Sequence, residues 1–407
     1  MAVLSLVLVC SLLYIGAVNG AGYLSKRPQS SGLCYYENIE DAHFSYDRND
    51  CEGPKHWCRL NECWTTCGSK RRQSPINIRT RKAKSRYIES FVFENTHKRV
   101  PATIFNNGHA PDFNVAVNEN NEENIILTNV PGRPSNKKYI FAQLHVHLGR
   151  KKGRGSEHSI DRKFYPMEAH MVFYDSKFDN IAKAKPAKDG LVVIGVMLKV
   201  KRKDGDDDDE EDEDDDDDDD DDDEREREGD EKHEHKKVCK YRDFRYFLKK
   251  CYKGRGRCKV RFARRLSFIM EKYYKKVREH KPSHSPEPQH TVPKDLVCGK
   301  PPSQETIEEK CIKKGSENSD AVSVSCGISP QDVLPFDQRF YTYPGSLTTP
   351  PCYETVQWIV FKCPIMVSHR AFEALRHVED SHEEPLHTLG VRRPLQKNKL
   401  QSVYKNF

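Results

Sequence analysis

Two histidines that are one residue apart are the first candidates for chemistry in this sequence. They lie in residues 141–148, which read Phe-Ala-Gln-Leu-His-Val-His-Leu. Because side chains alternate across a β-strand, Gln143, His145 and His147 would share one face, and the apolar residues between them would share the other. Two imidazoles about 7 Å apart at the Cα level can converge on one ion, while the opposite face packs into a core.

A third histidine follows in a second strand-like segment, Met167–Tyr174. By the same alternation, Glu168 and His170 share a face. Antiparallel pairing of the two segments would bring His170 close to the first two histidines, and three His ligands with an open fourth position are the donor set of a catalytic zinc site. Gln143 and Glu168 are each two residues from a ligand, where they can hold the second nitrogen of an imidazole. On these motifs alone, histidines that are exposed or hydrogen-bonded are an equally good interpretation.

The two segments belong to stretches that are typical of a β-rich domain. Residues 51–200 and 328–407 contain short apolar alternations separated by Gly, Pro and Asn turns, and 407 residues are enough to bury a large core. Because neither stretch is complete alone, we interpret residues 201–327 between them as an insertion into one domain.

The N-terminus predicts a secreted protein. Residues 3–18 are almost all apolar and small residues follow, which favours a cleaved signal peptide over residues 1–20 rather than a membrane span. The chain has 14 Cys, and secreted chains use cysteines for disulfides. Without Cys10 of the signal the count is odd, so one thiol is expected to be free or to bridge to another chain. Residues 21–50 are polar and are expected to form a Cys-containing extension on the surface.

The predicted insertion begins with dense negative charge and then turns basic. Residues 204–231 are nearly all Asp or Glu, with an unbroken run at Asp214–Asp223. Like charges at this density repel, so this segment is expected to be disordered. Dense carboxylates also favour weak binding of Ca2+ at several places, or contact with carbonate mineral. The alternative is that the segment is only a solvated spacer. Residues 236–281 mix Lys and Arg with aromatic side chains, which suggests some local order and an acidic matrix polymer or the acidic run as partner. Secretion makes a nucleic acid a poor candidate partner. No membrane contact is expected either, because no other stretch approaches the roughly 20 apolar residues of a membrane helix.

Eight ordered segments resemble the α-class carbonic anhydrases. They are residues 53–57 (GPKHW), 73–78 (QSPINI), 105–110 (FNNGHA), 143–147 (QLHVH), 155–161 (GSEHSID), 168–172 (EAHMV), 343–351 (YPGSLTTPP) and 393–396 (RPLQ). The resemblance implies a mainly β (α+β) fold: a large, twisted, mostly antiparallel sheet with short peripheral helices, interrupted here by the charged insertion. It also implies Zn2+ on His145, His147 and His170 and the reversible hydration of CO2 to bicarbonate.

The resemblance further assigns roles to residues outside the ligand set. Thr348 would orient the attacking oxygen and donate its hydroxyl proton to Glu157, while His109 would carry the proton away from the site. His158 would be structural. Pro111 and Asp112, which follow the turn of His109, could change its direction. The wall around CO2 would consist of Val172, Val193, Leu347, Thr349 and Trp358, and a disulfide would join Cys67 to Cys352.

More narrowly, the chain resembles the nacrein-like shell-matrix proteins of molluscs, which are secreted and carry a low-complexity insertion in the same domain. The insertion departs from their pattern, because theirs is largely a Gly-Asn type of repeat and this one is poly-Asp followed by a basic stretch. Two functions follow as hypotheses. One is an active enzyme coupled to calcium carbonate formation. The other is a matrix or mineral-binding protein in which the enzyme domain is mainly a scaffold.

Overall fold

The structure is a computed structural model that describes residues 34–96, 98–118, 123–201, 260–278, 293, 296–310, 321–380, 383–397 and 402–407. The predicted signal peptide, the first part of the extension and the acidic run lie outside these residues. Within them, no helix combines the length and the apolar character needed to cross a membrane.

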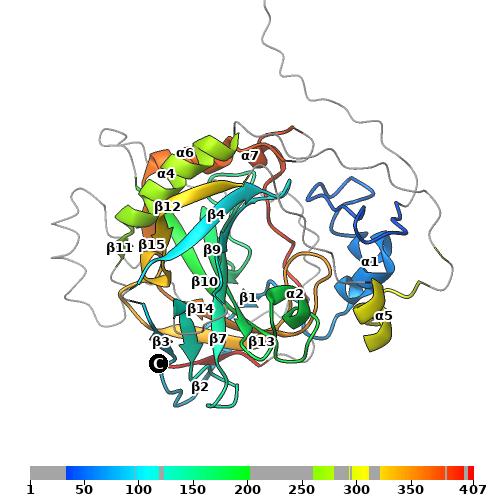
Figure 1. Ribbon diagram of the computed structural model, residues 1–407, viewed down its shortest axis with the longest axis horizontal. Helices are drawn as coiled ribbons and strands as arrows, with labels where there is room; N and C mark the ends of the chain where they lie inside the picture. Colours follow the sequence, from blue (N-terminus) through cyan, green and yellow to red (C-terminus); the bar gives the residue numbers. More distant parts are fainter. Residues whose placement is uncertain are drawn as a thin grey trace, which may run out of the picture.

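One large sheet dominates the part of the chain that the structure describes (Figure 1). Its main path runs β12 (Val322–Ile328), β4 (Val100–Asn106), β5 (Pro111–Val115), β7 (Tyr139–Leu148), β9 (Met167–Asp175), β10 (Leu191–Val200), β14 (Val356–Phe361), β13 (Phe340–Gly345), β16 (Tyr404–Lys405) and β2 (Lys84–Ser85). Four further strands pair beside this path: β3 (Val92–Glu94), β6 (Ile126–Thr128), β11 (Arg261–Phe262) and β15 (Ile365–Val367). Most pairs are antiparallel, with parallel pairs at β10–β14, β10–β15, β11–β15 and β16–β2.

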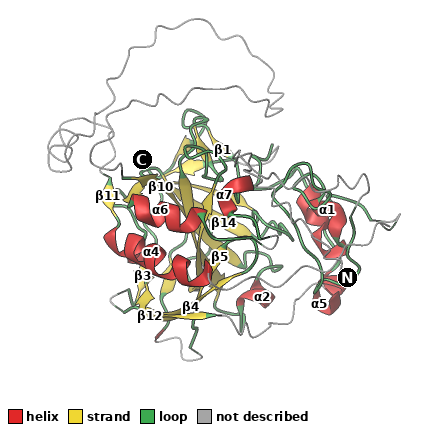
Figure 2. Cartoon of the chain, turned by 90° about the horizontal axis from the view of Figure 1, so that it is seen from above, coloured by secondary structure: helices red, strands yellow, loops and turns green. Residues whose placement is uncertain are grey.

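The helices are short and lie around the sheet (Figure 2). They are α1 (Trp57–Leu60), η1 (Glu62–Gly68), α2 (Ile181–Ala184), α4 (Arg264–Arg278), α5 (Gln304–Lys310), η3 (Pro330–Asp332), α6 (His369–Arg376) and α7 (Leu386–Leu389). A separate two-stranded pair joins β1 (Asn77–Ile78) to β8 (Ser159–Ile160). The predicted fold class, a mainly β sheet with short peripheral helices, is confirmed.

The middle strands of the sheet are buried on both faces, which makes them a rigid base for a site. Every residue of β9 is buried. On one side, Leu144, Val146 and Leu148 of β7 lie in the largest hydrophobic cluster. On the other side, Val172, Val193 and Trp358 lie in a second cluster. The expected alternation of β7 is therefore present, with its apolar residues directed into the core and its histidines directed away from them.

The longest helix of the described structure lies inside the range that we predicted to be an insertion. α4 packs beside α6, and its Leu266, Ile269 and Tyr274 are fully buried in the main core (Figures 1 and 2). Just before it, β11 extends the sheet: Ile365 of β15 pairs with Leu198 on one side and with Arg261 on the other. The prediction of an insertion over 201–327 was therefore wrong for three elements of the domain. The apolar residues of α4 and β12 are part of its core, and β11 pairs with β15 in its sheet.

The N-terminal extension also departs from its prediction. Cys34, Tyr36 and Phe44 are buried in a third cluster together with Trp57 and Trp64. A disulfide joins Cys34 to Cys51, and the indole nitrogen of Trp57 donates to the carbonyl oxygen of Ser45 at 3.1 Å. Residues 34–50 are thus folded against the domain and do not form a surface extension. Aromatic packing and a disulfide bury part of this segment although its overall composition is polar.

Disulfides tie this N-terminal region to distant parts of the chain. The predicted pair of Cys67 and Cys352 is confirmed, with a Cα–Cα distance of 4.9 Å. Cys58 is joined to Cys298, beyond the acidic run in sequence. Among the described residues, Cys326 is a free thiol, which agrees with the odd cysteine count.

Candidate metal centre

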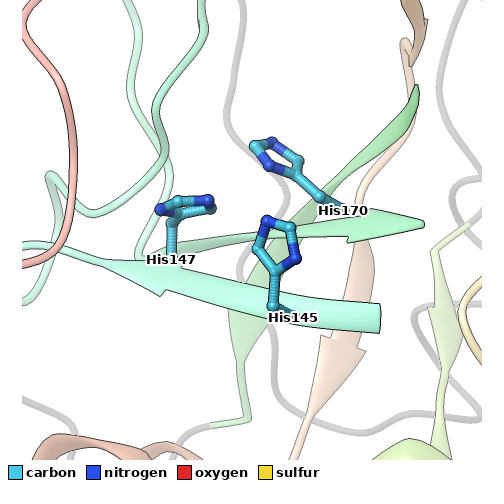
Figure 3. Close-up of side chains that lie close together, drawn as sticks. All are labelled: His145, His147 and His170. Carbon is cyan, nitrogen blue, oxygen red and sulfur yellow. The ribbon is translucent and has the colours of Figure 1, made fainter. Parts of the chain in front are cut away.

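Three imidazoles meet on one face of β7 and β9 (Figure 3). The antiparallel register places His145 opposite His170, and His147 opposite Glu168. The ring centroids of the three histidines are 4.6–5.2 Å apart, and one nitrogen from each ring lies within 4.8 Å of the others. The sequence-predicted triad is therefore brought together by adjacent positions on neighbouring strands.

The hydrogen bonds of two of these rings determine which nitrogen points into the site. Nδ1 of His147 lies 2.6 Å from the carbonyl oxygen of Val391, and a carbonyl oxygen only accepts, so this nitrogen carries the hydrogen. Its Nε2 is buried and has no hydrogen-bond partner. Nε2 of His170 lies 3.0 Å from Oε1 of Glu168 and carries the hydrogen for the same reason, which leaves Nδ1 of that ring as the donor atom.

This donor set fits a zinc ion. Buried polar atoms are normally hydrogen-bonded, so the lone pair on Nε2 of His147 requires another partner. Burial, with the charges of the neighbouring histidines, lowers the pKa of His145 well below its ordinary value. Burial also lowers the pKa of His170. Neutral imidazoles are the form that binds a metal, and three of them with an open position suit catalytic zinc.

Glu168 fixes two buried histidines at once. Its Oε1 accepts from Nδ1 of His158 at 2.8 Å as well as from His170, and Nε2 of His158 accepts from the hydroxyl of Tyr343 at 2.6 Å. Burial alone would raise the pKa of Glu168, but the charges and hydrogen bonds of His158 and His170 lower it well below its usual range. Gly195 makes room for this carboxylate, because a Cβ there would lie 2.8 Å from Oε1 of Glu168. Because both ring nitrogens of His158 take part in hydrogen bonds to Glu168 and Tyr343, His158 has no nitrogen left to bind a metal.

Glu157 lies close to the triad, and the predicted hydrogen bond between its carboxylate and Thr348 is not formed in this structure. Its Oε1 accepts from the backbone N–H of Arg393 at 2.9 Å. Its Oε2 lies 3.5 Å from Nε2 of His147 and has no hydrogen-bond partner. The hydroxyl of Thr348 is thus not bonded to that oxygen, although Thr348 is buried. An unpaired carboxylate oxygen is nevertheless free to accept such a hydrogen bond.

The residues proposed to hold CO2 form an apolar wall beside His170. Val172 pairs with Val193, and Val193 pairs with Trp358, across three adjacent strands. The ring of Trp358 lies 4.9 Å from that of His170, and its indole nitrogen donates to the carbonyl oxygen of Ser346 at 3.0 Å. Leu347 packs partly buried against the same cluster, and the carbonyl oxygen of Thr349 accepts from the backbone of Cys352.

His109 lies outside the triad and is covered by a residue that sequence reasoning missed. Its ring stacks on Phe44 with centroids 3.7 Å apart. Both residues line a pocket together with Tyr46, Asp380 and Leu386. Phe44 carries no sequence signal of its own, because it lies in a region predicted to be a surface extension.

Asp112 was singled out in the sequence only for the turn of His109, and its position beside the triad was not predicted. It belongs to β5, directly opposite His145, and its Oδ1 lies 3.8 Å from Nδ1 of that ring. The amide of Asn107 donates to its Oδ2 at 2.7 Å. Burial raises the pKa of Asp112 to about 7, against the opposing charge of Lys185. Pro111 and Asp112, the two residues after the turn of His109, form the start of β5.

The histidine face also carries Gln143, which lies opposite Asn114. The predicted hydrogen bond from Gln143 to a ligand is not formed at His145, because Nδ1 of that ring has no hydrogen-bond partner. Of the two residues predicted to support the ligands, only Glu168 does so in this structure.

Comparison with known proteins agrees with this geometry. Residues 52–210 and 302–407 match the family described as eukaryotic-type carbonic anhydrase. The chain is 48% identical over 362 residues to a nacrein-like protein of Mytilus californianus, covering 87% of this chain and 99% of that protein. It is 34% identical over 450 residues to nacrein of Pinctada fucata, covering 96% and 94%. It is 26% identical over 373 residues to carbonic anhydrase 7 of Mus musculus, covering 90% and 98%. With its three histidines converging from β7 and β9, the chain belongs to the eukaryotic-type carbonic anhydrase family.

Proposed function

We propose that the protein is an active zinc carbonic anhydrase that catalyses the reversible hydration of CO2 to bicarbonate and a proton. The observation that carries the proposal is the convergence of His145, His147 and His170. In His147 and His170, the ring nitrogen that points away from the site is already hydrogen-bonded to an oxygen. If the three histidines had only a structural role, the lack of a partner for the buried Nε2 of His147 would be unexplained, because buried polar atoms are normally hydrogen-bonded.

In this proposal the three histidines hold the metal and the surrounding residues prepare the reaction. Bound zinc would act as a Lewis acid that lowers the pKa of a water molecule to about 7, the value established for this same enzyme family. Glu157 offers its unpaired Oε2 to the hydroxyl of Thr348, which fixes the direction of the Thr348 oxygen toward the reacting group.

Substrate and proton are handled by different parts of the site. The wall of Val172, Val193, Leu347 and Trp358, with Thr349 at its edge, excludes water and holds the apolar CO2 molecule. His109 carries the proton outward, since an imidazole titrates in the range where it can both accept and release it.

Removal and return of the metal test this function. The purified protein is expected to contain about one zinc per chain. Prolonged dialysis against a strong chelator should abolish CO2 hydration, and one equivalent of Zn2+ should restore it, because the ligands come from a folded sheet that persists without metal. Metal content by mass spectrometry and stopped-flow hydration assays measure both quantities. A protein that holds zinc but has no activity would instead support the scaffold function.

We also propose that the protein is secreted and that its acidic run, residues 204–230, binds Ca2+ weakly near the place where bicarbonate is made. Support comes from the apolar N-terminus, from the density of carboxylates and from the nacrein names of its relatives. Deletion of residues 204–230 is expected to remove most Ca2+ binding measured by equilibrium dialysis, and most adsorption to calcite, while CO2 hydration stays unchanged. Unchanged Ca2+ and calcite binding would identify the run as a spacer.

A further inference from the structure

The Nδ1 atom of His145 is a buried nitrogen that nothing in the structure satisfies. It has no hydrogen-bond partner. By contrast, Nδ1 of His147 and Nε2 of His170, which point away from the site, are each hydrogen-bonded to an oxygen atom. When Nε2 of His145 serves as the ligand, Nδ1 carries a hydrogen and needs an acceptor, because an unpaired buried donor costs about 1–3 kcal/mol. One of the three predicted ligands thus lacks the support that the other two have.

The nearest acceptor comes from the neighbouring strand. Asp112 is the direct cross-strand partner of His145, so the two side chains lie on the same face of the sheet. Oδ1 of Asp112 is 3.8 Å from Nδ1, which is about 1 Å longer than a hydrogen bond. The other oxygen is already held by the amide of Asn107 at 2.7 Å, which turns Oδ1 toward the imidazole.

Gln143 is less well placed to support His145. Its backbone lies opposite Asn114, two residue pairs further along β7, and the unpaired Nδ1 of His145 shows that the amide of Gln143 does not reach this nitrogen. A carboxylate is also the stronger acceptor, because charge-assisted hydrogen bonds are roughly twice as strong as neutral ones. Asp112 therefore has advantages in both position and chemistry.

We propose that Asp112 is a positioning residue that accepts the Nδ1 hydrogen of His145 and so orients this imidazole toward the metal. The inference rests on the proposed zinc site. Supporting groups of this kind fix the tautomer and raise the basicity of a ligand, and their loss typically weakens metal binding about 10–100-fold.

Zinc affinity tests the role without relying on activity. In the Asp112→Asn variant the bond from Asn107 holds the carboxamide oxygen, so the –NH2 group faces Nδ1 and a donor meets a donor. The Kd for zinc, measured by competition with a chelator of known affinity, is expected to rise about 10–100-fold. The visible absorption of the Co2+-substituted protein should change as well, since that spectrum reports the arrangement of the ligands. Circular dichroism and thermal unfolding verify that the variant is folded.

Two further variants complete the test. Asp179→Asn, at a side chain that is 75% exposed, is the matched control and should bind zinc like the wild type. Gln143→Leu should weaken zinc binding less than Asp112→Asn does. Wild-type affinity and an unaltered Co2+ spectrum in folded Asp112→Asn would overturn the inference, as would a larger loss in Gln143→Leu. Failure of the wild-type protein to bind zinc would instead contradict the proposed function.

Discussion

Alanine in place of His147 is expected to remove zinc from the protein and to reduce CO2 hydration to the uncatalysed rate. This side chain is 2% exposed, its Nδ1 is held by the carbonyl oxygen of Val391, and its Nε2 has no other partner. Four-ligand zinc sites bind with about 10–16 kcal/mol, or roughly 2.5–4 kcal/mol per ligand, so affinity should fall about 10²–10³-fold. Competition with a chelator gives the affinity, and stopped-flow hydration gives the rate.

His377→Ala supplies the matched control, because this exposed histidine caps the C-terminal end of α6, where its ring contacts Glu373 and His387. Its zinc content and hydration rate should equal those of the wild type. If the His147→Ala protein is folded and keeps both zinc and activity, His147 is not a ligand, and the assignment of the site to the triad is wrong.

Methionine in place of Arg393 is expected to destabilise the domain by about 3–5 kcal/mol, because it removes one member of a buried, charged network. The guanidinium is 2% exposed and donates to Oε1 of Gln73 and to the carbonyl oxygens of Ser74 and Cys67. It also lies 5.4 Å from the centre of the Trp57 ring. Met fills a similar volume but removes three buried hydrogen bonds and the charge that faces Glu157.

Urea unfolding with the disulfides intact measures this loss as a lower midpoint. Arg392→Met is the neighbouring comparison: Arg392 is half-buried and lies over the ring of Phe164, so its replacement should cost less than about 1 kcal/mol. An equal loss of unfolding free energy in the Arg393→Met and Arg392→Met variants would show that the hydrogen bonds of Arg393 do not stabilise the fold.

The histidine site was predictable from sequence because the information is local. A period of two fixes which residues of β7 and β9 share a face, and this places Gln143, His145 and His147 together without any knowledge of the whole sheet. The support from Asp112 was not predictable in this way. It depends on the register between β5 and β7, which joins residues more than thirty positions apart.

The missed helix α4 had a usable signal. Its buried residues Leu266, Ile269, Met270, Tyr273 and Val277 follow helical spacing, so one face is apolar. The Lys and Arg residues of its outer face join a longer basic stretch, and average composition therefore concealed the apolar stripe. Periodicity is the better guide where charge is concentrated on one side of a helix.

Burial of the N-terminal region could not be predicted from period or composition. Tyr36 and Phe44 are isolated aromatic residues in a polar segment, and they are buried because Trp57 and Trp64 provide the other half of the cluster. The bridge from Cys34 to Cys51 then holds the segment in place. Cysteine arithmetic predicts that disulfides exist but not which residues they join, since connectivity depends on the folded chain.

The position of β15 between β10 and β11 has a consequence for how such a protein can diversify. Leu198 and Arg261 both pair with Ile365, so the chain leaves the sheet and returns to it two strand spacings apart, about 9.6 Å. The entropy of closing a loop across a fixed gap grows slowly, by about 0.6 kcal/mol for each doubling of its length. Residues 202–259 therefore occupy the place of an exchangeable cassette, whose length and charge can evolve, or be engineered, while the sheet that carries the histidines stays the same.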